Sequence, residues 1–215
     1  TGRDYILIGR PNPTTGPLAG FGEGSPWAEE RAVAAINKEG GITIDGKKMP
    51  IRIKVVDTES NPTKAAEIAA KLILDDKVDL MMVEHTPDTV NPVAATCERY
   101  QIPLISLDAP VEAWLTGGPY KWDYHAFWTV DTVSEVYFDM WDQAREKDPT
   151  LNKTVGLLMP NDPDGVAWGE VFNKKLQEKG YKGIDTGRFP VGTKDFSSMI
   201  NRFKEEKVEI ITGPM

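Results

Sequence analysis

The feature that most constrains the fold is the alternation of short apolar runs with stretches of helical periodicity along nearly the whole chain. The runs typical of strands lie at 5–8, 51–55, 78–83, 102–106, 155–159 and 208–212. Three of the helical stretches open at proline-containing starts, namely Ser25-Pro26, Asn61-Pro62 and Asn91-Pro92. Repeated strand–helix units form parallel sheets with helices on both faces, so the sequence predicts an α/β fold.

The alternation is interrupted once, between residues 108 and 123. This stretch is rich in proline, glycine and aromatic residues and has no periodicity, which is typical of a crossover between two lobes. Strand-like residues 125–128 and a helical pattern from Val133 to Trp141 then resume the alternation. We therefore expect lobe one at residues 1–120 and lobe two at residues 121–215.

Composition excludes several classes of partner. The 215-residue chain carries 33 acidic and 25 basic residues, for a net charge of −8, which argues against a nucleic-acid partner because phosphate binding requires a basic face. No apolar run is long enough to span a bilayer, so we expect no direct membrane insertion. Cys97 is the single cysteine and lies in a helical stretch, so a buried structural role is favoured over a reactive thiol.

Motifs that would indicate catalysis or a cofactor are weak. Residues 41–48 approach a phosphate-binding loop, but they follow a helix and lack the final Ser or Thr, so a turn is favoured. The glycines of 16–24 are not in dinucleotide-binding register, and they form either a flexible loop or a loop whose backbone approaches a ligand. Residues 161–165 resemble a calcium loop without its terminal acid, which favours a helix-capping turn.

Candidate acid–base residues are equally few. His85 and His125 are the only histidines, and neither a nucleophile elbow nor a zinc-protease motif is present. His125 alternates within a strand and is expected to be structural, whereas His85 ends a strand, where ligand contact and simple solvation are both open. We expect no catalytic residues, no metal and no cofactor, and therefore a binding protein rather than an enzyme.

Six stretches in a characteristic order connect the chain to a known family. They are Thr15–Gly22, Ala34–Ile42, Val55–Pro62, Ile102–Ser106, Val155–Asp162 and Asp195–Lys204. With them the chain resembles the type I periplasmic binding proteins of the branched-chain amino acid transport group. The resemblance implies two Rossmann-like lobes that close on a small organic solute without chemistry, with the C-terminal part of the family fold missing here.

The resemblance also implies a setting and partners. It implies a periplasmic or extracellular protein whose signal peptide has been removed, and delivery of the solute to the membrane permease of an ABC transporter. Related lobes also serve as ligand-sensing domains of receptors and regulators, which is the alternative role. An α/β enzyme is the third reading, and no constellation of residues supports it.

Ligand-binding residues are expected at the carboxyl ends of the strands, where open α/β sheets bind ligands, or in loops equivalent to those of the family. Lobe one would contribute Thr15, Phe21, His85, Thr86, Asp88 and Asp108, and lobe two would contribute Trp128, Asn161 and Asp164. Ordinary packing is the alternative role of Phe21 and Trp128.

The stretch from Glu84 to Thr89 departs from the family pattern. Amino-acid binders of the family carry Ser and Thr there to hold a carboxylate, whereas this chain has Pro87, which donates no N–H, and Asp88, which repels a carboxylate. Asp108 adds a second acid, and nearby aromatic residues favour a cation or an amine-bearing aromatic over leucine, isoleucine or valine. The alternative is that Asp88 only caps a helix starting near Pro92.

Overall fold

The protein consists of two compact units, and its computed structural model describes residues 2–214. Unit 1 comprises Thr1–Ala109 and Trp114–Phe127, and unit 2 comprises Pro110–Ala113 and Trp128–Met215. The division expected after residue 120 therefore falls inside unit 1. The polypeptide passes between the units at residues 109–114 and again after Phe127.

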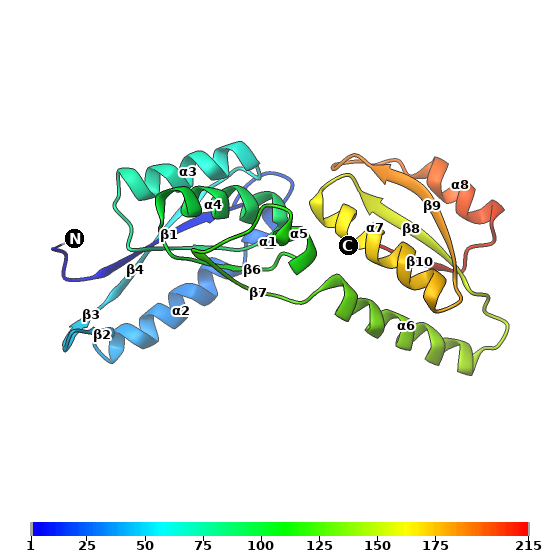
Figure 1. The fold of residues 1–215 in the computed structure, drawn as a ribbon, viewed down its shortest axis with the longest axis horizontal. Helices are drawn as coiled ribbons and strands as arrows, with labels where there is room; N and C mark the ends of the chain where they lie inside the picture. The colour runs from blue at the N-terminus through cyan, green and yellow to red at the C-terminus, as the bar shows by residue number, and fades with distance from the viewer. Residues whose placement is uncertain (1, 215) are drawn as a thin grey trace. The chain divides into compact units, whose positions relative to one another are not determined.

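Unit 1 is built on a five-stranded parallel sheet with the order β4-β1-β5-β6-β7 (Figure 1). The strands are β1 (Ile6–Asn12), β4 (Ile51–Asp57), β5 (Leu80–Val83), β6 (Leu104–Leu107) and β7 (Asp123–Ala126). A parallel neighbour requires a crossover connection, which the intervening helices supply. The prediction of an α/β fold with parallel sheets is confirmed.

Helices α3 (Pro62–Leu74) and α4 (Pro87–Tyr100) cover one face of this sheet and form its core (Figure 1). Leu72 of α3, Val93 of α4 and Met81 of β5 are all fully or almost fully buried there. On α3, the predicted periodicity is confirmed, since Ala65, Ile68, Ala69, Leu72 and Ile73 are its buried residues. Apolar burial on this face supplies the main stabilisation of unit 1.

Helix α2 (Ser25–Lys38) lies on the opposite face and follows the short helix α1 (Ala19–Gly22) (Figure 1). None of its residues is buried, so the predicted helix is confirmed but its alanines form no packed stripe. Polar bonds attach it instead. The Asn37 side chain donates to the Ile51 carbonyl at 2.8 Å and accepts from the Ile51 N–H at 2.7 Å. Ser25 and Glu29 make the other attachments, described with the site below.

The P-loop-like stretch 41–48 contains the predicted turn. It forms an antiparallel hairpin of β2 (Ile42–Ile44) and β3 (Lys47–Met49), and the turn lies between them. Asp45 and Gly46 occupy the turn with φ of 48° and 78°, the left-handed region that two-residue hairpin turns favour.

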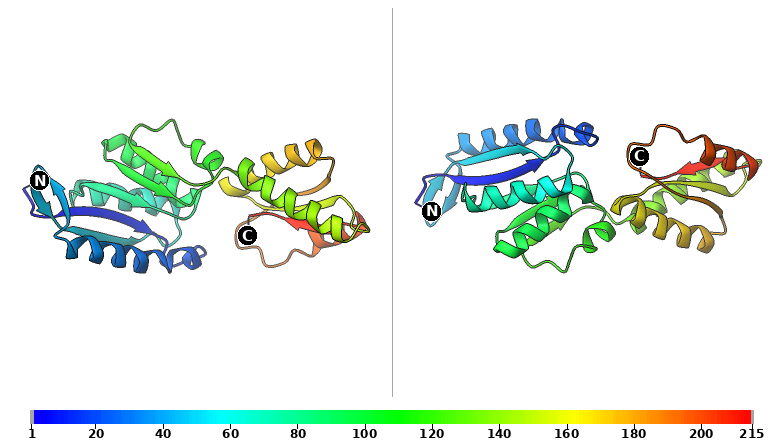
Figure 2. Two further views of the ribbon diagram at one scale, coloured as in Figure 1. Left: turned by 90° about the horizontal axis from the view of Figure 1, so that it is seen from below. Right: turned by 90° about the horizontal axis from the view of Figure 1, so that it is seen from above.

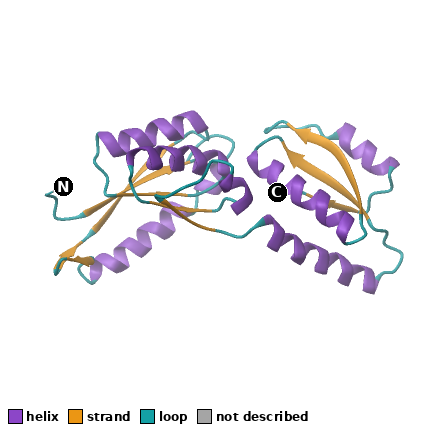
Figure 3. Ribbon diagram, viewed as in Figure 1, coloured by secondary structure: helices purple, strands orange, loops and turns teal. Residues whose placement is uncertain are grey.

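Unit 2 contains a three-stranded parallel sheet with the order β10-β8-β9 (Figure 2). Its strands are β8 (Thr154–Pro160), β9 (Lys182–Phe189) and β10 (Ile210–Thr212). Its helices are α6 (Val130–Lys147), α7 (Pro163–Glu178) and α8 (Ser197–Glu205) (Figure 3). Val155 and Leu157 of β8 belong to the core formed with α6 and α7, whereas Gly156 points the other way, against Phe203 of α8. The alternation of a strand thus divides the helices between two faces.

Two sequence expectations are wrong in detail. The helix expected at Asn91-Pro92 begins at Pro87, and Pro92 lies inside it. Both prolines fit a helix start, and Pro87 takes the first turn, where its missing N–H costs no intrahelical bond. The strand expected at residues 125–128 of lobe two corresponds to β7, which pairs with β6 of unit 1. The stretch 108–123 also contains a short helix, α5 (Val111–Leu115), where no periodicity is visible in the sequence.

Replacing Phe172 with alanine tests the core of unit 2. Its fully buried ring stacks on Trp168 at 5.3 Å and contacts Trp141 at 6.1 Å between ring centroids. We expect Phe172→Ala to lower the free energy of unfolding by about 3–5 kcal/mol. Urea unfolding followed by tryptophan fluorescence measures it, with Met140→Ala at an exposed position of α6 as the control. Equal midpoints for the two variants would contradict this core.

Candidate functional site

The strand order of unit 1 brings three strand ends together. Strands β1, β5 and β6 are consecutive neighbours and all run parallel, so their carboxyl ends meet at one edge of the sheet. His85 follows β5, Asp108 follows β6, and Arg10 lies near the end of β1. This edge is where open α/β sheets bind ligands.

The centre of this edge is the buried guanidinium of Arg10, whose side chain is 0% exposed. Its Nε donates to Glu29 of α2 at 2.6 Å, and its Nη2 lies 3.0 Å from Glu84 at the end of β5. Its Nη1 donates to the Pro11 carbonyl at 2.9 Å. A buried charge is tolerated only when it is paired, and here two carboxylates and a carbonyl surround it.

His85 links this buried pair to a more accessible acid. Its Nε2 lies 3.0 Å from Glu84 and 2.8 Å from the Ser25 hydroxyl, while its Nδ1 lies 3.1 Å from Asp108. Ionised carboxylates only accept hydrogen bonds, so an N–H on either ring nitrogen faces an acceptor: Glu84 at Nε2 and Asp108 at Nδ1. The Asp108 side chain is 34% exposed against 15% for His85, so Asp108 is the more accessible of the two.

The backbone at both strand ends is left-handed. His85 has φ of 47° and Asp108 has φ of 58°, in a region that favours glycine and that His and Asp enter more readily than most residues. Such conformations persist where the surrounding structure fixes them, and they are concentrated at functional sites. Phe21 of α1 stacks on the His85 ring, with 6.0 Å between centroids, and keeps half of its own surface exposed.

The pKa of Glu84 is set by this environment. Burial by itself would raise it, but hydrogen bonds from His85 and Ser25 and the charge of Arg10 lower the pKa of Glu84 to about 2. Glu84 is therefore a permanent negative charge at neutral pH, which keeps Arg10 paired. We name Arg10, Ser25, Glu29, Glu84, His85 and Asp108 together the charged cluster.

The remaining lobe-one residues predicted for the site are Thr15, in the loop after β1, and Thr86 and Asp88, at the start of α4. The Thr15 hydroxyl donates to Asp57 at 2.7 Å. Burial alone would raise the pKa of Asp57, but bonds from Thr15, Glu59 and Thr14 hold it below its ordinary value. Thr86 is the residue before α4, and Asp88 lies in the first turn of that helix. Asp88 therefore does not cap a helix that starts near Pro92, and that alternative is wrong in this respect.

The three lobe-two residues predicted for the site belong to unit 2. The Trp128 ring meets Trp168 edge-on, with 5.8 Å between centroids, and is about one-third exposed. Asn161 follows β8, and its backbone N–H donates to the Phe189 carbonyl at 2.7 Å. Asp164 lies in the first turn of α7. The neighbouring Asp162 caps that helix by accepting from the Gly165 N–H at 2.7 Å, so the calcium-like stretch is a helix cap, as predicted.

Sequence reasoning did not assign Arg10, Glu29, Glu84 or Ser25 to the site. One signal was available, because Arg10 directly follows the apolar run 5–9, and an arginine buried there requires acids as partners. The expected roles of two other residues are confirmed. His125 is structural, since its ring bonds to Ser106 and to the Ala109 carbonyl at 2.8 and 2.7 Å. Cys97 is fully buried, and burial raises the pKa of its thiol far above the ordinary value.

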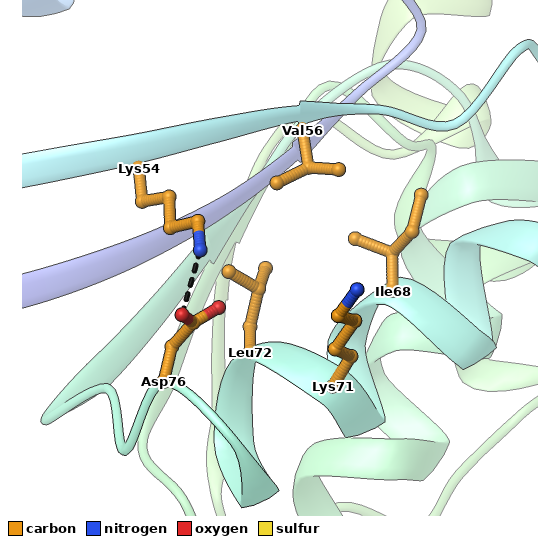
Figure 4. Close-up of a pocket in the computed structure, with 6 residues that line it drawn as sticks. All are labelled: Lys54, Val56, Ile68, Lys71, Leu72 and Asp76. Atoms are coloured by element: carbon orange, nitrogen blue, oxygen red, sulfur yellow. Dashed lines mark hydrogen bonds and ion pairs between the residues drawn. The ribbon is translucent and has the colours of Figure 1, made fainter.

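A pocket of about 160 Å³ elsewhere in unit 1 is not formed by any residue predicted for the site (Figure 4). It lies between β4 and α3, over Val56, Ile68 and Leu72. Lys54 and Asp76 form an ion pair of 2.6 Å across it, as the dashed line in Figure 4 shows. Lys71 is the third charged residue that lines it.

Ligating atoms of Glu84, His85 and Asp108 lie within 4.8 Å of one another, which is close enough to consider a metal ion. The geometry opposes one, however. Glu84 faces Nε2 and Asp108 faces Nδ1, so the two carboxylates lie on different nitrogens of one ring. A single ion can bind only one of these nitrogens, and Arg10 already neutralises Glu84. The arrangement fits a hydrogen-bonded ion cluster better.

Glu84→Gln tests this electrostatic account. Because the folded protein holds Glu84 ionised down to a pKa of about 2, against an ordinary value of 4.5, the carboxylate contributes stability that is fully present above about pH 4.5 and lost as the pH falls toward 2. We expect the variant to lose about 3 kcal/mol of unfolding free energy at neutral pH.

Urea unfolding at a series of pH values between neutrality and pH 2 measures this difference, which should shrink across the acid range. Glu30→Gln, at an exposed position of α2, is the control. It should change the unfolding free energy by less than about 0.5 kcal/mol. A pH-independent loss in Glu84→Gln would show that the carboxylate acts by shape alone.

The sequence of the chain is similar to those of known binding proteins. The chain is 23% identical over 208 residues to the leucine-, isoleucine-, valine-, threonine- and alanine-binding protein of Pseudomonas aeruginosa, covering 97% of this chain and 53% of that protein. The chain thus spans about half the length of the curated relatives that it matches. In the described residues, no helix is both long and apolar enough to cross a membrane.

Solved structures share the fold at low identity. The branched-chain amino acid transporter substrate-binding protein of Streptococcus pneumoniae, in complex with isoleucine, matches with a TM-score of 0.77 and 23% identity, over 98% of this chain and 57% of that chain. A solute-binding protein of an ABC transporter from Rhodopseudomonas palustris, in complex with 3,4-dihydroxybenzoic acid, matches with a TM-score of 0.75 and 20% identity, over 99% and 55%.

The resemblance inferred from six sequence stretches is confirmed at the level of the whole chain. The sequence model of the periplasmic binding protein family matches residues 6–214, which is nearly every residue that the structure describes. The family consists of binding proteins, in agreement with the expectation of a binder rather than an enzyme. By this match and by its fold, the chain belongs to the periplasmic binding protein family.

Proposed function

We propose that this chain belongs to the solute-binding component of an ABC transporter that acts in the periplasm or outside the cell. It binds a small organic solute without chemical change and delivers it to a membrane permease. The family match over residues 6–214 carries this proposal. The polar strand ends of unit 1 support it, because ligands of open α/β sheets are held there.

We further propose that each unit carries ligand-binding residues at its strand ends and helix starts. Unit 1 contributes Phe21 and Asp108, which both lie against His85, together with Thr15, Thr86 and Asp88 near the same strand ends. Unit 2 contributes Trp128, Asn161 and Asp164, which lie just before α6, after β8 and in the first turn of α7.

The solute that co-purifies with the full-length protein tests the proposed function. Native mass spectrometry of freshly purified protein, followed by denaturation and identification of the released molecule, should find one small organic compound in stoichiometric amount. The molecule should be recovered unchanged after prolonged incubation with the protein. Recovery of a converted product would instead indicate an enzyme.

Family membership leaves the ligand open, since the two solved relatives above hold isoleucine and 3,4-dihydroxybenzoic acid respectively. We expect that leucine, isoleucine and valine are not the natural ligands of this chain. Pro87 removes an N–H donor at the start of α4, and Asp88 places a carboxylate in the same turn, where an amino-acid carboxylate would need donors.

Calorimetric titration of ligand-free protein with each of the three amino acids tests this expectation, and none should bind with submicromolar affinity. The co-purified solute, added back to the same preparation, is the positive control for an intact site. Submicromolar binding of leucine, isoleucine or valine would show that the start of α4 does not exclude an amino-acid carboxylate.

A further inference from the structure

The charged cluster has an excess of negative charge that is accessible at one end. Three carboxylates, Glu29, Glu84 and Asp108, face one guanidinium and one imidazole. Arg10 is fully buried and neutralises Glu29 and Glu84 in part, and even a protonated His85 leaves one net negative charge. Because the side chain of Asp108 is the most exposed of the three carboxylates, this charge is available at Asp108.

The helix starts at this edge do not reverse that charge. A helix N-terminus normally attracts anions through free N–H groups and the helix dipole. Here α4 begins with Pro87, which has no N–H, and Asp88 in its first turn already complements the dipole. At α2, Pro26 removes a second donor, and the Ser25 hydroxyl is bonded to His85. An anionic ligand would therefore meet carboxylates before it met donors.

We propose that Asp108 is the specificity-determining carboxylate of this site, that it selects a solute bearing an ammonium or similar cationic N–H group, and that His85 is the residue that positions it. This rests on the proposed function, since it concerns the same site. A cationic N–H donor bonds to the exposed edge of Asp108, and the exposed face of Phe21 packs against the apolar part of the solute.

The positioning role follows from the two ring nitrogens. The Nδ1 of His85 lies 3.1 Å from Asp108, where an N–H on this nitrogen donates to the carboxylate and orients it, while Nε2 lies 3.0 Å from Glu84 and 2.8 Å from Ser25. Both nitrogens are thereby engaged inside the protein. His85 therefore acts on the solute indirectly, through Asp108. From the sequence, a direct contact between His85 and the ligand was expected as one of two possibilities.

The experiment compares three probes that share one ring and differ in charge: benzylamine, benzyl alcohol and benzoate. Their binding to the full chain, freed of co-purified solute, is measured by ligand-observed NMR, which also detects weak binding. We expect benzylamine to bind best and benzoate worst. Asp108→Asn should weaken benzylamine about 10- to 100-fold, the value of a hydrogen bond to a charged group, and should leave benzyl alcohol nearly unchanged.

Asp45→Asn is the matched control for Asp108→Asn. Asp45 also has a left-handed backbone, with φ of 48°, but it lies in the β2–β3 turn outside the charged cluster. Asparagine tolerates this backbone region, so both variants are expected to fold. A zinc chloride titration without organic probe tests a metal ion as the occupant. One-to-one zinc binding that is lost in Asp108→Asn would overturn the proposal.

Two conservative variants separate positioning by His85 from general support of the fold. In His85→Asn the amide nitrogen can occupy the place of Nδ1 and still donate to Asp108, whereas in His85→Gln it occupies the place of Nε2. We expect His85→Asn to retain benzylamine affinity within about 3-fold and His85→Gln to lose about 10-fold. Equal losses in both variants would mean that His85 only supports the fold, and would overturn its positioning role.

The outcomes distinguish this proposal from the proposed function. If benzoate binds as well as benzylamine, or if Asp108→Asn leaves benzylamine binding unchanged, the inference fails while solute binding stands. If the co-purified solute of the full-length protein is an anion without a cationic nitrogen, the inference also fails. If no probe binds and no solute co-purifies, the proposed function fails and the inference fails with it.

Discussion

The ion pairs of Arg10 are the interaction on which unit 1 depends at its functional edge. A guanidinium with no exposed surface is stable there only because Glu29 from α2 and Glu84 from β5 face it. Glu29 belongs to α2, which covers one face of the sheet, and Glu84 directly follows β5 within the sheet. The same pairs that neutralise the charge therefore tie a helix to the centre of the sheet and place His85 beside them.

Strand order turns this local arrangement into a site. In the order β4-β1-β5-β6-β7, β5 stands between β1 and β6, so Glu84 and His85 stand between Arg10 and Asp108. Along this edge of the sheet, the exposure of the charged side chains to solvent increases from the buried guanidinium of Arg10 to the accessible carboxylate of Asp108. Parallel pairing is required for it, because antiparallel neighbours would send alternate strand ends to opposite edges.

The sequence predicted most of the fold, because apolar runs and proline starts are local signals. It misplaced the start of α4, since Pro87 and Pro92 carry the same signal, and it assigned β7 to the wrong unit, since the pairing partner of a strand is not encoded in its own pattern. Two residues of the charged cluster were among those predicted to bind the ligand. Strand ends indicated His85 and Asp108, but the contacts of Glu29 with Arg10 are long-range and only packing reveals them.

Helix α2 buries none of its residues, and its described attachments are directional polar bonds through Ser25, Glu29 and Asn37. Such bonds fix the rotation of a helix but add little hydrophobic free energy, so we expect α2 to open by local unfolding more readily than α3 and α4, which bury residues in the core. Since two of those bonds end in the charged cluster, occupancy of the cluster and closure of the helix are thermodynamically linked. We expect a solute that binds to the cluster to slow amide hydrogen exchange along α2.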